Sequence, residues 1–186
     1  MSVSNVIICN NALSRIGGRQ IASFDENTEL AQLCRNNYDI TRLSLLRAHP
    51  WSCAKKRQIL SPISTYPSFG YGHAFPLPSD YVRVLAVNTE RYEIENRYIL
   101  ADTETVYLEY IFDNKVEQTW DSMLIEAITL KMAYILCKPV TGSSAERDAL
   151  DQEFARLIAV AKNVNGQERP SQDVQYAESS YYWERF

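Results

Sequence analysis

The sequence is short of the residue types that most metal and catalytic sites need. It contains only two histidines and four cysteines among 186 residues, and no two cysteines lie closer than 19 positions apart. There is therefore no Cys-x-x-Cys pair and no zinc-ribbon spacing, and the HExxH and GxSxG patterns are missing as well. We expect no catalytic residue, no cofactor and no metal ion. Cys9, Cys34, Cys53 and Cys137 are interpreted as free, mostly buried thiols in a reducing compartment.

The chain also lacks a long apolar run and a basic surplus. Its most apolar stretch, 123–137, is interrupted by Glu126 and Lys131 and is too short and too charged to span a bilayer. The 19 Lys and Arg residues against 23 Asp and Glu residues give a net charge of −4, which disfavours tight nonspecific binding to nucleic acid. No basic, apolar leader is visible near Met1, so no secretory signal peptide is expected. With 46% hydrophobic residues, one main folded core is expected.

Hydrophobic periodicity predicts an α+β protein that is mainly helical. Apolar residues recur at helical spacing over four segments, namely 4–16, 28–49, 119–138 and 143–165. Between the second and third segments, residues 61–80 hold four prolines and two glycines, which indicates a loop. Strand patterns surround this loop at 52–60, 81–87, 92–94, 97–100 and 106–111, with Glu95-Asn96 as the turn of a hairpin. The predicted fold is a four-helix bundle with one small inserted antiparallel sheet and an extended C-terminal tail.

Capping residues place the helix ends. Ser4 is expected to cap the first helix, Thr28 or Asn27 the second and Thr119 the third. Pro50 should end the second helix just before it, and Lys138-Pro139 should end the third.

The fourth helix carries a capping-box pattern. Ser143 is followed three residues later by Glu146, and in such a box each side chain accepts from the backbone N–H of the other residue. The domain organisation expected from these signals is 1–50 for the first bundle helices, 51–118 for the β-rich insertion, 119–166 for the last bundle helices and 167–186 for the tail.

Three groups of polar residues are candidates for chemistry. His49 precedes Pro50 and His73 lies in the proline-rich loop, and both are interpreted as structural or exposed. The carboxylates of Asp25, Glu26 and Glu29 suit the start of a helix, where negative charge is favourable. A glycan-hydrolase site built on Glu26 or Glu29 remains an alternative, because the distance between two carboxylates cannot be read from a sequence.

The third group is the basic run Lys55-Lys56-Arg57. On a strand, Lys56 faces away from Lys55 and Arg57, so the run cannot form a patch on one side. A solvated edge strand that discourages aggregation is the favoured interpretation. A small DNA-binding module that contacts phosphates through this run is the alternative.

The C-terminal tail is rich in aromatic residues but has no helical or strand period. Five of the chain's 21 aromatic residues lie in its last eleven positions: Tyr176, Tyr181, Tyr182, Trp183 and Phe186. Large apolar side chains on an extended segment cost solubility unless a surface covers them. Packing onto the chain's own core is one outcome, and docking into another protein, where tyrosine and tryptophan are favoured, is the preferred one.

Five segments, taken in order, resemble the tail tubular protein A family, the head-to-tail adaptors of short-tailed bacteriophages. They are Ala-Leu-Ser-Arg-Ile-Gly at 12–17, His-Pro-Trp-Ser-Cys-Ala-Lys-Lys-Arg at 49–57, Phe-Pro-Leu-Pro-Ser-Asp-Tyr-Val-Arg-Val-Leu at 75–85, Trp-Asp-Ser-Met-Leu-Ile-Glu-Ala at 120–127 and Lys-Pro-Val-Thr-Gly-Ser at 138–143. The resemblance covers about residues 3–165, so the aromatic tail lies outside it.

The resemblance implies a structural virion protein and not an enzyme. Members of that family form a ring, commonly a dodecamer, between the portal protein and the tail nozzle, and the ring extends the DNA channel. The implied partners are further copies of this chain, the portal protein, the nozzle protein and possible tail fibres, with DNA as nonspecific cargo and no membrane. The implied location is the neck of the virion, after assembly in the host cytoplasm. By this resemblance the five tail aromatics are candidates for docking to the portal.

Overall fold

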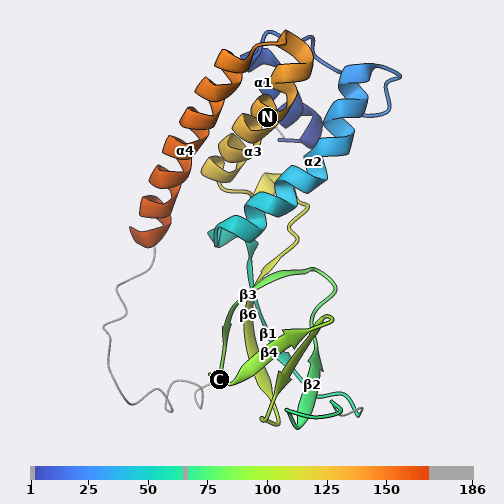
Figure 1. Ribbon diagram of the computed structural model, residues 1–186, viewed down its shortest axis with the longest axis vertical. Coiled ribbons are helices and arrows are strands. Elements are labelled where there is room, and N and C mark those ends of the chain that lie inside the picture. Colours follow the sequence, from blue (N-terminus) through green and yellow to red (C-terminus); the bar gives the residue numbers. More distant parts are fainter. Residues whose placement is uncertain (1–2, 65–66, 168–186) are drawn as a thin grey trace. The chain divides into compact units, whose positions relative to one another are not determined.

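The computed structural model describes residues 3–64 and 67–167. These residues form two compact units (Figure 1). The helical unit comprises residues 3–54 and 113–166, and the β unit runs from Lys55 to Phe112. The chain thus leaves the helical unit once, forms the β unit and returns. The two units are described separately below.

The first two helices begin where their capping residues predict. Helix α1 spans Asn5–Arg15, and the Ser4 hydroxyl accepts from the backbone N–H of Ile7 at 3.4 Å. Helix α2 spans Glu29–Ala48, and Thr28 caps it by accepting from the N–H of Ala31 at 3.3 Å. Both N-caps and the end of α2 before Pro50 are confirmed.

The third helix begins and ends later than the sequence suggests. Helix α3 spans Ser122–Thr141 and is capped by Asp121, which accepts from the N–H of Met123 at 2.6 Å. Thr119 instead belongs to a short 3-10 turn, Glu117–Thr119. The predicted stop at Pro139 is also wrong, because near a C-terminus proline removes only one helical hydrogen bond and Gly142, with φ of 70°, closes the helix three residues later.

The fourth helix forms half of the predicted capping box. Helix α4 spans Ser144–Gln167, and the N–H of Glu146 donates to the Ser143 hydroxyl at 3.2 Å. The N–H of Ser143 donates to the Thr141 hydroxyl at 3.0 Å and not to the Glu146 carboxylate.

The predicted four-helix bundle is wrong, although the α+β class holds. Helices α1 and α2 both pack on α3, which is buried nearly all round. Helix α4 runs beside α3 and buries only a narrow stripe, chiefly Leu150 and Ala161, while most of its other side chains are exposed (Figure 1). Helix α4 therefore packs on the helical unit by one side only and adds little to its core.

The single predicted sheet is also wrong, because the β unit contains two. Strands β1 (Lys55–Leu60), β6 (Val106–Phe112) and β3 (Tyr81–Val87) form one antiparallel sheet in that order. Strands β2 (His73–Pro76), β5 (Tyr98–Ala101) and β4 (Tyr92–Glu95) form the other. The second sheet was not predicted because β2 lies inside the proline-rich segment, where Pro76 occupies the strand's last position and disturbs no pairing beyond it.

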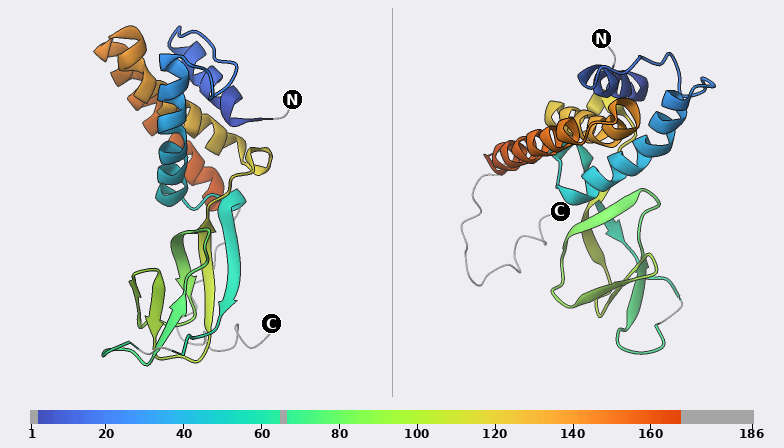
Figure 2. Two further views of the ribbon diagram at one scale, coloured as in Figure 1. Left: turned by 90° about the vertical axis from the view of Figure 1, so that its right-hand side faces the viewer. Right: turned by 45° about the horizontal axis from the view of Figure 1, so that its top comes forward.

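Side chains from both sheets form the core of the β unit. Phe75 and Ile99 come from one sheet, and Val106, Leu108 and Tyr110 alternate inward along the central strand of the other. Asn96 and Arg97, both with positive φ, form the two-residue turn between β4 and β5, so the hairpin turn lies one residue later than predicted. In the left view of Figure 2, β1 (teal) lies at one side of the β unit and the hairpin of β4 and β5 at the other.

Candidate functional site

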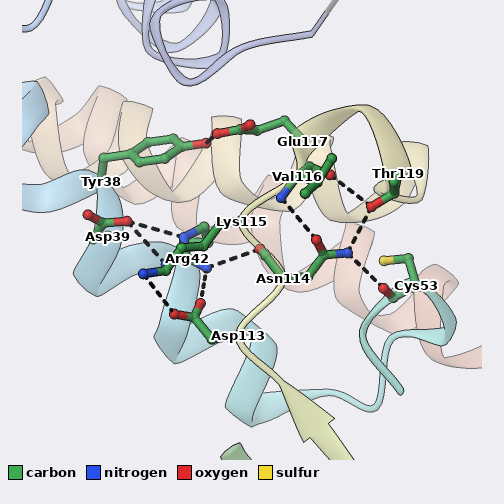
Figure 3. A network of polar contacts seen from close by, with 10 residues as sticks. All are labelled: Tyr38, Asp39, Arg42, Cys53, Asp113, Asn114, Lys115, Val116, Glu117 and Thr119. Atoms are coloured by element: carbon green, nitrogen blue, oxygen red, sulfur yellow. Dashed lines mark hydrogen bonds and ion pairs between the residues drawn. The ribbon is translucent and has the colours of Figure 1, made fainter. Parts of the chain in front are cut away.

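The sequence-predicted docking residues lie outside the described part of the chain. Tyr176, Tyr181, Tyr182, Trp183 and Phe186 all belong to 168–186. The predicted role of these side chains stays a prediction. The described residues contain one concentrated polar network, which lies in the helical unit where the chain leaves for the β unit and returns from it (Figure 3).

Arg42 is the centre of this network. It lies on the inner face of α2 and is only 2% exposed. Its guanidinium donates to Asp113 and, at 3.1 Å, to the carbonyl of Asn114, while Nε and Nη2 each lie 3.2 Å from Asp39 Oδ1. Burial alone would lower the pKa of Arg42, but the hydrogen bond to Asp113 and the charges of Asp113 and Asp39 raise it above its ordinary value. Arg42 is therefore charged, and it links α2 to Asp113 and Asn114, where the chain re-enters the helical unit.

Asn114 completes the network on the opposite side. Its Nδ2 donates to the carbonyl of Cys53 at 2.8 Å and to the Thr119 hydroxyl at 2.9 Å, and its Oδ1 accepts from the N–H of Val116 at 3.0 Å. Cys53 lies two residues before β1 and Asn114 lies two residues after β6. One buried side chain thus joins the outgoing and returning chain segments of the helical unit.

A shallow pocket of about 250 Å³ opens beside Arg42. Its lining mixes both signs of charge and comprises Asn5, Phe24, Arg35, Tyr38, Asp39, Arg42, Lys115 and Glu117. Burial and, secondarily, the charge of Glu117 raise the pKa of Tyr38, whose hydroxyl lies 3.5 Å from Glu117 Oε1. The volume falls below the usual range of small-molecule sites, about 300–1,000 Å³. Two of the lining residues, Arg42 and Asp39, are paired with each other.

The carboxylates considered for glycan hydrolysis lie elsewhere. Glu26 accepts from the backbone N–H of Ala22 at 2.6 Å and so holds the turn before α2. Glu29 lies in the first turn of α2, where a negative charge complements the helix dipole. The pocket beside Arg42 is lined by neither of them.

The basic run lies on the edge strand β1. The register places Lys56 opposite Tyr110, on the core-facing side, and Lys55 and Arg57 on the other side. Lys56 pairs with Asp80 at 2.6 Å and lies 3.9 Å from the centre of the Phe112 ring, while Arg57 approaches Glu109 at 3.6 Å. Lys56 and Arg57 each have an acidic neighbour within the chain, which weakens the run as a phosphate site.

Among the described histidines and cysteines, Cys9 and Cys34 are in contact with each other. His49 is buried with its ring edge-on to Trp51 at 4.6 Å, and His73 begins β2 with its ring 6.3 Å from Phe75. All four cysteines are free; Cys53 is half-buried and the other three are buried. A contact with Cys34, together with burial, raises the pKa of the Cys9 thiol.

The described residues contain neither a metal-binding cluster nor a membrane-spanning helix. Over 3–64 and 67–167, no group of three or more His, Cys, Asp or Glu side chains is placed to hold a metal ion. None of the helices found there is both long enough and apolar enough to cross a membrane.

Arg42 and Asn114 were not among the sequence-predicted site residues. Arg42 had one visible signal, since it is a charged residue beside Tyr38, Thr41 and Leu45 on the stripe of α2 that faces the core. A charge in such a position needs a buried partner. Asn114 had no comparable signal, because an asparagine after a strand usually indicates only a turn.

Family models and curated proteins supply no relative of this chain. No protein-family model matches the chain, and no curated protein matches it either. What the chain does is therefore inferred from its own residues.

Proposed function

We propose that this chain is a head-to-tail adaptor of a short-tailed bacteriophage, which forms a ring between portal protein and tail nozzle and extends the DNA channel. The single observation that carries the proposal is the ordered set of five sequence segments that resemble the tail tubular protein A family. The proposed site of action is the neck of the virion, and the protein acts by assembly and not by catalysis.

The places of these segments in the fold support the proposal. Gly17, at the end of the first segment, has a φ of 67°, and the N–H of Gly18 beyond it closes α1 on the carbonyl of Leu13 at 2.8 Å. In the second segment, Trp51 is fully buried and donates to the carbonyl of Leu45 at 3.0 Å. In the third segment, Phe75 lies in the β core. These residues stabilise the fold, so the segments that carry the resemblance have structural roles here.

The charge of the chain supports the same proposal. A channel lining must let DNA slide, and a strongly basic lining would bind phosphates. The net charge of −4 and the acidic partners of Lys56 and Arg57 fit that requirement. The aromatic tail, 167–186, supplies large contact surfaces of the kind that protein interfaces use, and the portal is its proposed binding partner.

The direct test mixes the full chain with the portal protein of the same virus. Negative-stain images and co-sedimentation should show added density on one end of the portal ring and one copy of this chain per portal subunit. Free portal and free chain in every fraction would contradict the proposal. A cell-wall zymogram is the complementary test, since a clearing zone that disappears in Glu26→Gln or Glu29→Gln would favour the hydrolase alternative.

A further inference from the structure

Two outer strands of the β unit, one in each sheet, have edges of opposite charge. Strand β1 is the outer strand of one sheet and β4 the outer strand of the other, and within the described residues no further strand pairs with either. An outer strand presents a row of backbone N–H and C=O groups to any strand that approaches. The side chains on the two strands decide which partner strand each edge accepts.

The β1 edge is basic, regular and apolar at one position. Lys55 and Arg57 lie on the same side of the strand, two residues apart, and the pairing of β1 with β6 is free of bulges over all six residues. Arg57 approaches Glu109 of β6 at 3.6 Å, but 82% of its side chain is exposed and can contact a second carboxylate. Ile59 continues the same side and is 62% exposed. A regular strand edge with an exposed isoleucine can pair with a strand of another molecule. Lys55 and Arg57 make pairing with a basic strand unfavourable.

The β4 edge is acidic, and its two charges have the same spacing as the two cations of β1. Glu93 and Glu95 also lie two residues apart on one side of their strand, and both are exposed. Between them Ile94 is 43% exposed. The chain therefore carries a basic edge and an acidic edge with the same spacing between charges.

The other two outer strands are poorer templates. Strand β3 has two irregularities in its register with β6. The carbonyl of Ala74 in β2 already accepts from the N–H of Ile63, at 2.9 Å. The open regular edges of the β unit are thus β1 and β4.

We propose that β1 of one copy pairs with β4 of the next copy, so that neighbouring subunits are joined through a shared β-sheet. Because both pairs of charges are spaced by two residues, Lys55 and Arg57 come opposite Glu93 and Glu95 in either strand direction. Directly opposed charges of opposite sign stabilise strand pairs. Pairing β1 with β1, or β4 with β4, would oppose like charges and is disfavoured.

This selectivity makes the contact head-to-tail. Each copy offers one basic and one acidic edge, so every copy binds two neighbours through different surfaces, and repetition of such a contact closes into a ring when the rotation fits. The inference rests on the proposed adaptor function and assigns the surfaces that hold its ring together. A role for the basic run in preventing indiscriminate aggregation is the competing explanation, and it predicts no selective partner.

Two complementary charge reversals of the full chain test the contact. Lys55→Glu with Arg57→Glu makes the β1 edge acidic, and Glu93→Lys with Glu95→Lys makes the β4 edge basic. Sedimentation velocity over a concentration series should show self-association of the unaltered chain, weakened roughly a hundredfold in each double variant. A one-to-one mixture of the two variants should associate again, because each then offers the edge that the other needs.

Controls separate the edges from general charge effects. Glu104→Lys, at an exposed residue after β5, and Arg19→Glu, in the helical unit, should associate like the unaltered chain. Circular dichroism must show that all variants are folded. A milder variant, Lys55→Gln with Arg57→Gln, should give an intermediate loss of self-association. It places no new negative charge beside Glu109, so it tests the contact even if the charge reversal disturbs folding.

Carbodiimide coupling of an equal mixture of isotopically light and heavy chains locates the contact. It should join Lys55 of one isotope to Glu93 or Glu95 of the other. A chain that stays monomeric throughout, variants that associate normally, or a mixture that fails to associate would each overturn the inference. Portal binding is measured separately. If both double variants still bind the portal but self-associate like the unaltered chain, the β1–β4 contact is contradicted and the adaptor function is not.

Discussion

The side chain of Asn114 donates a hydrogen bond of 2.8 Å to the backbone carbonyl of Cys53, and so joins the two places where the chain crosses between its units. These residues lie 61 positions apart in the sequence. Because Asn114 is only 3% exposed and also bonds Thr119 and Val116, it fixes the start of the segment that leads into α3.

Replacing Asn114 should destabilise the helical unit. Asn114→Ala removes the three hydrogen bonds of a buried side chain, with an expected cost of about 2–4 kcal/mol. Urea unfolding followed by circular dichroism measures the loss. The exposed Asn36→Ala serves as the matched control and should change stability by less than about 0.5 kcal/mol. Equal stability of both variants would show that the Asn114 contacts contribute little.

Removing Arg42 should cost more than removing an exposed arginine. Arg42→Met leaves Asp113 without its buried partner, and breaking such a pair typically costs about 3–5 kcal/mol. Adding Asp113→Asn to this variant should recover part of the loss, because the carboxylate has lost its buried partner and keeps the exposed Lys115, 3.5 Å away. The comparison variant is Arg19→Met, at an exposed position, for which urea unfolding should give a nearly unchanged free energy. A double variant no more stable than Arg42→Met would contradict the pairing.

Tyr110 should make stability depend on pH in the alkaline range. Burial, followed by the hydrogen bond to Asp80 and the charge of Asp80, raises the pKa of Tyr110 to about 12. A raised tyrosine pKa means that the folded state favours the neutral phenol. The stabilisation is therefore complete below the ordinary value of 10 and is lost as the pH rises from there through about 12.

Phenolate absorbance measures this titration directly. The component near pH 12 should be absent from Tyr110→Phe and should move to lower pH in Asp80→Asn, where the negative neighbour is gone. An identical titration curve for the unaltered chain and Asp80→Asn would contradict the contact between the two side chains.

Trp120 should tolerate phenylalanine far better than alanine. The indole is 7% exposed, and its Nε1 is buried with no hydrogen-bond partner among the described residues. Trp120→Ala opens a cavity at a cost of about 3–5 kcal/mol. Trp120→Phe keeps most of the ring and removes an unpaired donor, so less than half of that cost is expected. Thermal unfolding compares the two, and equal losses would show that the indole N–H has a partner after all.

The sequence predicts local structure well where one residue decides it. Ser4 and Thr28 cap their helices as expected because a hydroxyl at a helix start bonds the free N–H groups directly. The predictions that were wrong failed for two different reasons, one local and one tertiary. Pro139 stays inside α3 because Gly142 ends the helix, and β2 forms within the proline-rich segment because it pairs with β5 over four residues.

The candidate site was less accessible to sequence analysis. Arg42 and Asp113 lie 71 positions apart, and nothing in either local sequence indicates the other. The opposite charges of β1 and β4 become meaningful only when the sheet order shows that both strands are outer ones. The aromatic tail stays a sequence-based prediction, since it lies outside the described residues.

The most direct measurement of the central claim is portal binding by full-length variants of the tail. Serine at Tyr176, Tyr181, Tyr182, Trp183 and Phe186 together should abolish co-sedimentation with the portal ring, while the same number of substitutions at polar tail positions, Gln172, Gln175, Glu178, Glu184 and Arg185, should leave most of it. Circular dichroism must show both proteins folded. Portal binding by the aromatic variant with unchanged affinity, or no binding by the unaltered chain, would contradict the account.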